Sequence, residues 1–189
     1  MAKKLLVLCM AAIMAVAALV AGCGGDQKAA SDNKVLKVGT NADFAPFEFQ
    51  DENGKEYQGF DMDLIRAIGE EMGYKVEISN IQFDGLIPAI QAGNIDVAIT
   101  GMTINEERKQ NVLFSDPYYK SGLSIIVAKD NNDIKTFQDL KGKKVAVQIG
   151  TTSAAEVNKI GGVEVKEFNS SADTFMELRA KGVDAVVND

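Results

Sequence analysis

The sequence predicts a protein of the α/β class, organised as two lobes that each contain a parallel sheet. Short apolar runs typical of buried strands alternate with segments whose apolar residues recur at helical spacing. One scheme, a helix that ends at glycine followed by an apolar strand entered through aspartate, occurs at 91–98 and again at 179–186. Hydrophobic residues make up 46% of the chain and charged residues 25%, which is typical of globular proteins.

The first 22 residues (1–22) are expected to form a lipoprotein signal peptide. Lys3 and Lys4 precede an apolar stretch at 5–18, which is short for a membrane-spanning helix. Residues 19–23 read Leu-Val-Ala-Gly-Cys and resemble a bacterial lipobox, in which the cysteine carries the lipid. We therefore expect lipidation at Cys23, on the outer side of the cytoplasmic membrane or in the periplasm. A plain secretory leader with a chance cysteine is the alternative.

The segment 23–34 is polar and rich in small residues, so we expect a flexible tether between the lipid and the folded part. The first lobe is expected to span 35–117. Its predicted strands end near Thr40, Ile78 and Thr100, and its predicted helices cover 60–72, 86–93 and 105–108. Aspartate or asparagine precedes or opens each helix, which predicts N-caps at Asp61, Asp84 and Asn105, and glycine stops at Gly73 and Gly93.

The second lobe is expected to span 123–189, after a hinge at 118–122. Its predicted strands cover 122–128, 143–148, 163–165 and 183–187, and its predicted helices begin at 153 and 172. The alternation of strand and helix predicts parallel strands with helices on both faces of the sheet.

Polar and aromatic side chains gather where these strands end, and ligands of parallel sheets bind beyond such ends. Arg108 offers a planar fork for a carboxylate, Asp189 offers a carboxylate for an ammonium group, and helix starts add backbone N–H donors. In the alternative interpretation Arg108 is a surface residue paired with Glu106 or Glu107, and the aromatic residues belong to the core. The candidate ligand-binding residues are Asn41, Phe44, Phe83, Thr100, Gly101, Thr103, Arg108, Gln148, Thr151, Thr152, Asn188 and Asp189.

The composition excludes several function classes. The formal net charge is −7, whereas a nucleic-acid-binding face is basic. The chain has no histidine, which removes the commonest general base and metal ligand. The two cysteines, Cys9 and Cys23, lie in or beside the leader, so the folded part has neither a disulfide nor a thiolate metal site. We expect no metal, no cofactor and no nucleic acid partner.

An ordered set of motifs resembles a known family. The run 40–49 contains Ala45-Pro46-Phe47-Glu48-Phe49, and further matching runs follow at 59–64, 83–89, 101–108 and 114–119. Over 35–189 the chain is similar to the polar amino-acid-binding proteins of ABC importers, above all to glutamine-binding members. The resemblance implies a type II periplasmic-binding fold with two Rossmann-like lobes. It also implies a monomer that is not an enzyme, which binds a free L-amino acid and delivers it to a membrane permease.

The resemblance also implies residue roles. Arg108, with Thr103 and the Thr152 backbone, would hold the α-carboxylate, and Asp189 with the Gly101 carbonyl would hold the α-ammonium. Phe44 and Phe83 would pack on the ligand side chain. The end of that side chain would face three amides, Asn41, Gln148 and Asn188.

Those three positions depart from the glutamine-binding pattern, which has aspartate, lysine and histidine there. Uncharged amides suit a neutral polar side chain, since burying an unpaired charge is costly. Glutamine is therefore expected over arginine or lysine, unless Asp43 turns inward.

Members of the family continue past the strand that ends this sequence, so we expect a truncated chain with an incomplete second lobe. Two alternative functions remain open: the ligand-binding part of a sensor or receptor, and an enzyme resembling cyclohexadienyl dehydratases. The enzyme needs a catalytic acid over the substrate ring, for which the strand ends offer only Asp43 and Asp189.

Overall fold

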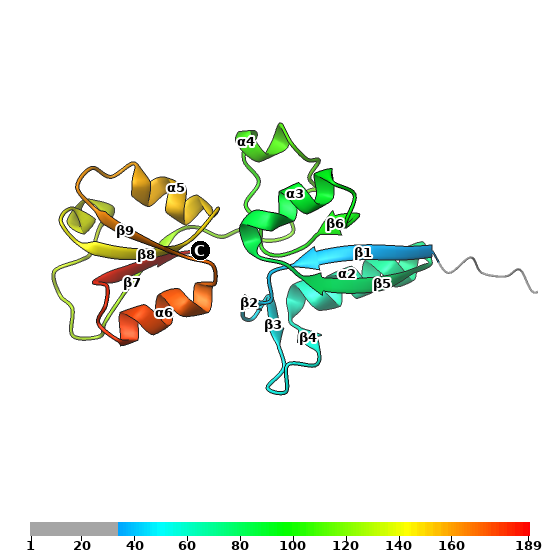
Figure 1. Cartoon of the computed structure of the whole chain (residues 1–189), viewed down its shortest axis with the longest axis horizontal. Helices are drawn as coiled ribbons and strands as arrows, with labels where there is room; N and C mark the ends of the chain where they lie inside the picture. Colours follow the sequence, from blue (N-terminus) through cyan, green and yellow to red (C-terminus); the bar gives the residue numbers. More distant parts are fainter. Residues whose placement is uncertain (1–33) are drawn as a thin grey trace, which may run out of the picture. The chain divides into compact units, whose positions relative to one another are not determined.

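The computed structural model describes residues 34–189 (Figure 1). The predicted signal peptide, its cysteine Cys23 and the tether up to Asn33 lie outside the described residues. The first strand begins at Lys34, which was predicted to be the last residue of the tether. Within the described part of the chain, no helix has both the length and the apolar character needed to cross a bilayer.

The first sheet has the strand order β5-β1-β6, and both pairs are parallel (Figure 1). Its strands are β1 (Lys34–Thr40), β5 (Tyr74–Asn80) and β6 (Val97–Ala98), and its helices are α2 (Phe60–Met72), α3 (Leu86–Gln91) and α4 (Glu106–Lys109). Between β1 and α2 lies a small antiparallel sheet that the sequence did not predict, formed by β2 (Asp43–Phe44), β3 (Glu48–Gln50) and β4 (Tyr57–Gln58).

Helix α2 buries Met62 and Ile65 against the first sheet. The helical spacing of Phe60, Leu64, Ile65, Ile68 and Met72 predicted the helix, but Phe60, Ile68 and Met72 are exposed. It ends at Gly73, whose left-handed backbone (φ 72°) closes the last turn, also as predicted. The predicted N-cap at Asp61 is wrong. Gly59 occupies the cap position, and the buried Asp61 carboxylate accepts hydrogen bonds from distant parts of the chain instead.

The predicted cap at Asp84 is also wrong. Asp84 is exposed and lies inside the 3₁₀ helix η1 (Phe83–Gly85), and Gly85 is the residue that precedes α3. The extra turn moves the start of the helix one residue beyond the reach of the Asp84 side chain. The cap at Asn105 is confirmed, since its side chain accepts a hydrogen bond from the backbone N–H of Arg108.

The second sheet has the strand order β7-β10-β8-β9 (Figure 1). Its elements are β7 (Ser124–Val127), η2 (Phe137–Leu140), β8 (Lys144–Gln148), α5 (Thr152–Asn158), β9 (Glu164–Phe168), α6 (Ser171–Arg179) and β10 (Ala185–Asn188). The strands β8, β9 and β10 are parallel, but β7 runs antiparallel to β10, contrary to the prediction. The connection from β7 to β8 contains only the short 3₁₀ helix η2 and not a helical crossover, so no parallel direction is imposed.

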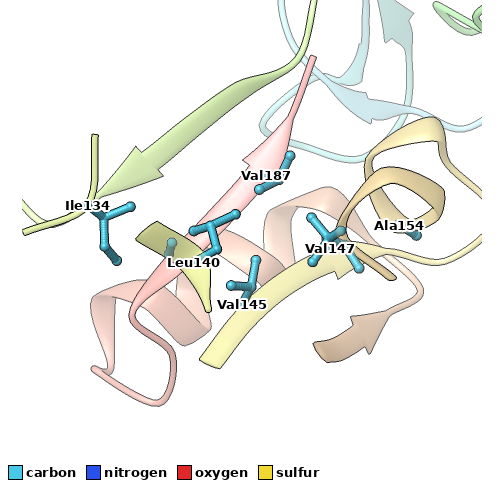
Figure 2. Packing of buried hydrophobic residues seen from close by; sticks show 8 residues of the cluster. Ile134, Leu140, Val145, Val147, Ala154 and Val187 are labelled. Carbon is cyan, nitrogen blue, oxygen red and sulfur yellow. The ribbon is translucent and has the colours of Figure 1, made fainter. Parts of the chain in front are cut away.

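Both faces of the second sheet are covered. Val145, Val147 and Val187 point into one core with Leu140 and helix α5 (Figure 2), whereas Ala146 and Val186 point into the opposite core with Leu178 of α6. Successive residues of β8 and β10 therefore face different helices, as expected for strands buried on both sides. The rigid packing fixes the carboxyl ends of these strands.

Candidate ligand-binding site

One cavity gathers the residues that the sequence analysis selected. Its volume is about 30 Å³, so its walls lie close together in this structure. All twelve candidate residues line it, and Asp43 and Glu48 line it as well. The ends of β1, β8 and β10, and the loop after β6, contribute residues to it, which is the place where open parallel sheets bind ligands.

Arg108 is buried in this cavity, with 8% of its surface exposed. Its guanidinium donates to the Thr103 carbonyl (2.7 Å) and to the Gly150 carbonyl (3.0 Å), and it lies over the Phe83 ring with 5.3 Å to the centroid. The alternative, a surface arginine paired with Glu106 or Glu107, is wrong. Arg108 is buried, Glu106 pairs with Lys109 at 2.8 Å, and within residues 34–189 Arg108 forms no ion pair with Glu107.

The charge of Arg108 has no carboxylate within ion-pair distance among residues 34–189. Burial lowers the pKa of the guanidinium, an effect that the charge of Asp189 opposes. Burial likewise raises the pKa of Asp189, which Arg108 opposes. The cavity therefore contains a desolvated cation and, apart from it, a desolvated acid.

Uncharged amides line another part of the cavity. The Gln148 side-chain N–H donates to the Asn41 side-chain oxygen (2.6 Å) and to the Asn169 carbonyl (3.1 Å), and the Asn41 backbone N–H donates to the Thr100 hydroxyl (3.0 Å). Asn188 is buried at the end of β10. The contact between Gln148 and Asn41 joins residues 107 positions apart in sequence and connects the ends of the two sheets.

The remaining predicted residues lie around these groups. Phe44 and Phe83 are half-buried, and neither belongs to the core clusters of the two sheets. Thr151 caps α5 by accepting from the Ala154 backbone N–H (3.2 Å) and donates to the Gln148 carbonyl (2.7 Å), and Thr152 is the first residue of that helix. This cap holds the start of α5 against the end of β8.

Asp43 lines the cavity but points toward the second sheet. Its carboxylate accepts from the Ser171 backbone N–H (3.0 Å), and its backbone carbonyl accepts from the Ser171 hydroxyl (2.9 Å) at the first residue of α6. Burial raises the pKa of Asp43, and the hydrogen bonds from Ser170 and Ser171 oppose this rise. The side chain is therefore held by α6 in this structure.

Sequence reasoning missed the role of Glu48. It is 1% exposed and lines the cavity, and its carboxyl accepts from the Thr100 hydroxyl (2.9 Å). The signal for Glu48 in the sequence was a carboxyl between two phenylalanines, Phe47 and Phe49, in strands too short for a periodic pattern.

Among residues 34–189, no group of three or more acidic or cysteine side chains is arranged to hold a metal ion.

The geometry defines a class: an α/β protein of two sheets whose strand ends line a shared polar cavity. The chain belongs to the bacterial extracellular solute-binding proteins, family 3, which match it over residues 36–189. It is 34% identical over 189 residues to the arginine-binding extracellular protein ArtP of Bacillus subtilis (strain 168), covering 98% of this chain and 72% of that protein.

Solved structures agree with this assignment. An ancestral arginine-binding protein, solved with arginine and with glutamine, is 54% identical and has a TM-score of 0.80, with 82% of this chain covered. The aligned part covers 70% and 69% of those two chains. An ancestral amino acid-binding protein described as a precursor of cyclohexadienyl dehydratase is 46% identical with a TM-score of 0.79, over 82% of this chain and 70% of that one. The predicted periplasmic-binding-protein type II fold is confirmed.

Proposed function

We propose that this chain is the solute-binding component of an ABC importer and that its cavity captures a free polar α-amino acid. The observation that carries the proposal is the buried Arg108, which lacks an ion-pair partner within residues 34–189 and shares the cavity with the acid Asp189. An α-amino acid carries an ammonium and a carboxylate group on the same carbon atom, so it complements Asp189 and Arg108 at once.

The ligand orientation follows from donors and acceptors. A guanidinium has five N–H donors, and the carbonyls of Thr103 and Gly150 take two of them. The others remain for the α-carboxylate, with the backbone N–H of Thr152 at the start of α5 as a further donor. The α-ammonium faces Asp189 and the Gly101 carbonyl. No step in this scheme requires catalysis, and we propose a binding protein and not an enzyme.

We propose glutamine as the ligand, because the remaining part of the cavity is lined by amides. Asn41, Gln148 and Asn188 are all buried there, and each carries a donor and an acceptor but no charge. A glutamine side chain replaces the direct contact between Asn41 and Gln148 with two hydrogen bonds of the same kind. Arginine is the second candidate, favoured by the 54% identity to an ancestral protein that was solved with arginine and with glutamine.

The proposed lobes, 35–117 and 123–189, close on the ligand about a hinge at 118–122. Three contacts support this arrangement, since each joins one proposed lobe to the other: Gln148 with Asn41, Arg108 with the Gly150 carbonyl, and Ser171 with Asp43. Ligand contacts with both lobes would favour the closed state, which the permease recognises. We further propose that the protein is monomeric and that a lipid on Cys23 anchors it to the membrane.

The experiment is a thermal-shift screen of the purified protein with the twenty amino acids, followed by calorimetric titration of those that raise the midpoint. A ligand that binds the folded state alone stabilises it by about 2.7 kcal/mol at a hundred times its dissociation constant. Glutamine is expected to give the largest shift. The variant Asn41→Asp adds a charge beside the proposed amide contact, so it should weaken glutamine binding and strengthen arginine binding.

A largest shift with arginine in the wild-type protein would replace glutamine by the second candidate. No shift with any amino acid, together with turnover of prephenate or arogenate, would contradict the proposal and favour the enzyme alternative.

A further inference from the structure

Two carboxyl groups lie next to each other beneath the cavity. Glu48 on β3 is 1% exposed and Asp61 on α2 is 0% exposed, and the charge of Asp61 acts on the Glu48 carboxyl to raise its pKa. Glu48 Oε1 accepts from the Thr100 hydroxyl (2.9 Å). Asp61 Oδ2 accepts from the Gly101 backbone N–H (2.9 Å) and the Tyr118 hydroxyl (2.8 Å). Through these bonds the pair holds two consecutive residues that line the cavity.

The other oxygen of each carboxyl, Glu48 Oε2 and Asp61 Oδ1, is buried and has no hydrogen-bond partner among residues 34–189. Two ionised carboxylates would leave both oxygens unsatisfied and place like charges in contact, which is strongly unfavourable. A single proton on Glu48 Oε2, donated to Asp61 Oδ1, satisfies both oxygens. Asp61 then accepts three hydrogen bonds, from the Gly101 backbone N–H, the Tyr118 hydroxyl and Glu48.

The electrostatic surroundings favour the protonated form. Burial, and then the charge of Asp61, raise the pKa of Glu48 to about 9. The other titratable groups that face the pair are Asp43, whose charge raises this pKa further, and Tyr118. Burial and Asp61 also raise the pKa of Tyr118, so that its hydroxyl stays a donor. No lysine or arginine among residues 34–189 forms an ion pair with either acid.

We propose that Glu48 and Asp61 share one proton and that this proton-sharing pair positions the ligand-contacting loop after β6. The Thr100 hydroxyl donates to Glu48 and accepts from the Asn41 backbone N–H (3.0 Å), so the acid fixes the direction of both bonds. Gly101, whose left-handed backbone (φ 54°) turns the loop, is held by Asp61. Glu48 and Asp61 are thus positioning residues. The ligand-affinity part of this inference rests on the proposed function.

Loss of the proton has a defined consequence. An ionised Glu48 repels Asp61, and the two carboxylates can no longer bond to each other. The pair then ceases to hold Thr100 and Gly101 in one arrangement, and the fraction of chains competent to bind falls with the protonated fraction. Apparent affinity scales with that fraction.

The test uses Glu48→Gln, since the glutamine amide donates to Asp61 and its carbonyl accepts from Thr100 without titrating. The matched control is Glu52→Gln, which removes the same charge from an exposed position of the same hairpin. The dissociation constant of glutamine is measured for the three proteins from pH 6 to pH 10. Titration of the ligand itself cancels in the ratio of wild type to variant at each pH.

At pH 10, about one unit above the pKa of Glu48, roughly a tenth of wild-type chains keep the proton. Wild-type affinity is therefore expected to fall about tenfold relative to Glu48→Gln between pH 7 and pH 10, whereas the ratio of wild type to Glu52→Gln stays constant. A ratio to Glu48→Gln that stays constant over this range would overturn the proposal. So would a tenfold or larger loss at pH 7 in Glu48→Gln, because the required group would then be a carboxylate.

A ligand-free measurement separates this inference from the proposed function. Wild-type protein at pH 7 should show the infrared carbonyl band of a protonated carboxylic acid, and Glu48→Gln should lack it. The midpoint of thermal unfolding of the wild-type protein should also fall relative to that of Glu48→Gln as the pH rises toward 9, because the folded wild-type chain holds a proton that the unfolded chain releases. If no amino acid binds but these signatures appear, the proposed function fails and the shared proton stands. If both signatures are missing, the shared proton is wrong.

Discussion

Replacing Arg108 is the perturbation with the largest expected effect on binding. Arg108 is 8% exposed and its guanidinium donates to two carbonyls. In the proposed binding mode its remaining N–H groups donate to the ligand carboxylate. Arg108→Lys keeps the charge but removes the planar fork, so that one of two parallel hydrogen bonds is lost. Arg108→Ala removes the charge as well and leaves the ligand carboxylate buried without a partner.

The magnitudes follow from these losses. One hydrogen bond to a charged group contributes about 1.5–3 kcal/mol, so Arg108→Lys should weaken binding roughly 10- to 150-fold. Truncating one partner of a buried, hydrogen-bonded charge pair costs about 2–5 kcal/mol, so Arg108→Ala should weaken binding from roughly 30-fold to several thousand-fold. The order of the two variants is the sharper prediction.

The assay is calorimetric titration with glutamine and with arginine, and ligand-free thermal unfolding confirms that each variant folds. Arg179→Ala is the matched control, because Arg179 is an exposed arginine on α6, away from the cavity. It should bind within about twofold of the wild type, as expected for a surface substitution. Binding by Arg108→Ala within threefold of the wild type would refute the assignment of the carboxylate site.

Three further predictions concern stability. Asn105→Ala removes the cap that accepts the Arg108 N–H (2.8 Å) and should cost about 1 kcal/mol in unfolding free energy, with weaker ligand binding in the same titrations. Leu140→Ala, at a fully buried position, should cost about 2–5 kcal/mol in denaturant unfolding, whereas Leu113→Ala, at a residue 99% exposed, should change it by less than about 0.5 kcal/mol. Burial raises the pKa of Asp43, so the stabilisation from its protonated form is complete below the ordinary value of 3.8 and is lost as the pH rises through the folded-state pKa. Over that range the unfolding midpoint of the wild type should fall relative to that of Asp43→Asn.

Several features were predictable because their signal is local. The cap at Asn105 and the stop at Gly73 need only the flanking residues and the helical spacing, and both are confirmed. The candidate site was predictable from a general property of parallel sheets, since residues after strand ends gather at one edge. All twelve selected residues line the cavity.

Other features depend on contacts between distant residues. Asp61 precedes an apolar run like a helix cap, but the Gly101 N–H and the Tyr118 hydroxyl, 40 and 57 positions away, take its carboxylate instead. Strand direction has no local signal, which explains why the antiparallel β7 was missed. Strands of two or three residues, such as those around Glu48, are too short to show alternation.

Calorimetric titration of the purified wild-type protein with glutamine and with arginine tests the central claim most directly. The account predicts saturable binding of one ligand per chain, tighter for glutamine than for arginine, and weakened at least about 30-fold by Arg108→Ala. Binding by Arg108→Ala within threefold of the wild type, or no binding of any of the twenty amino acids by a folded chain, would contradict it.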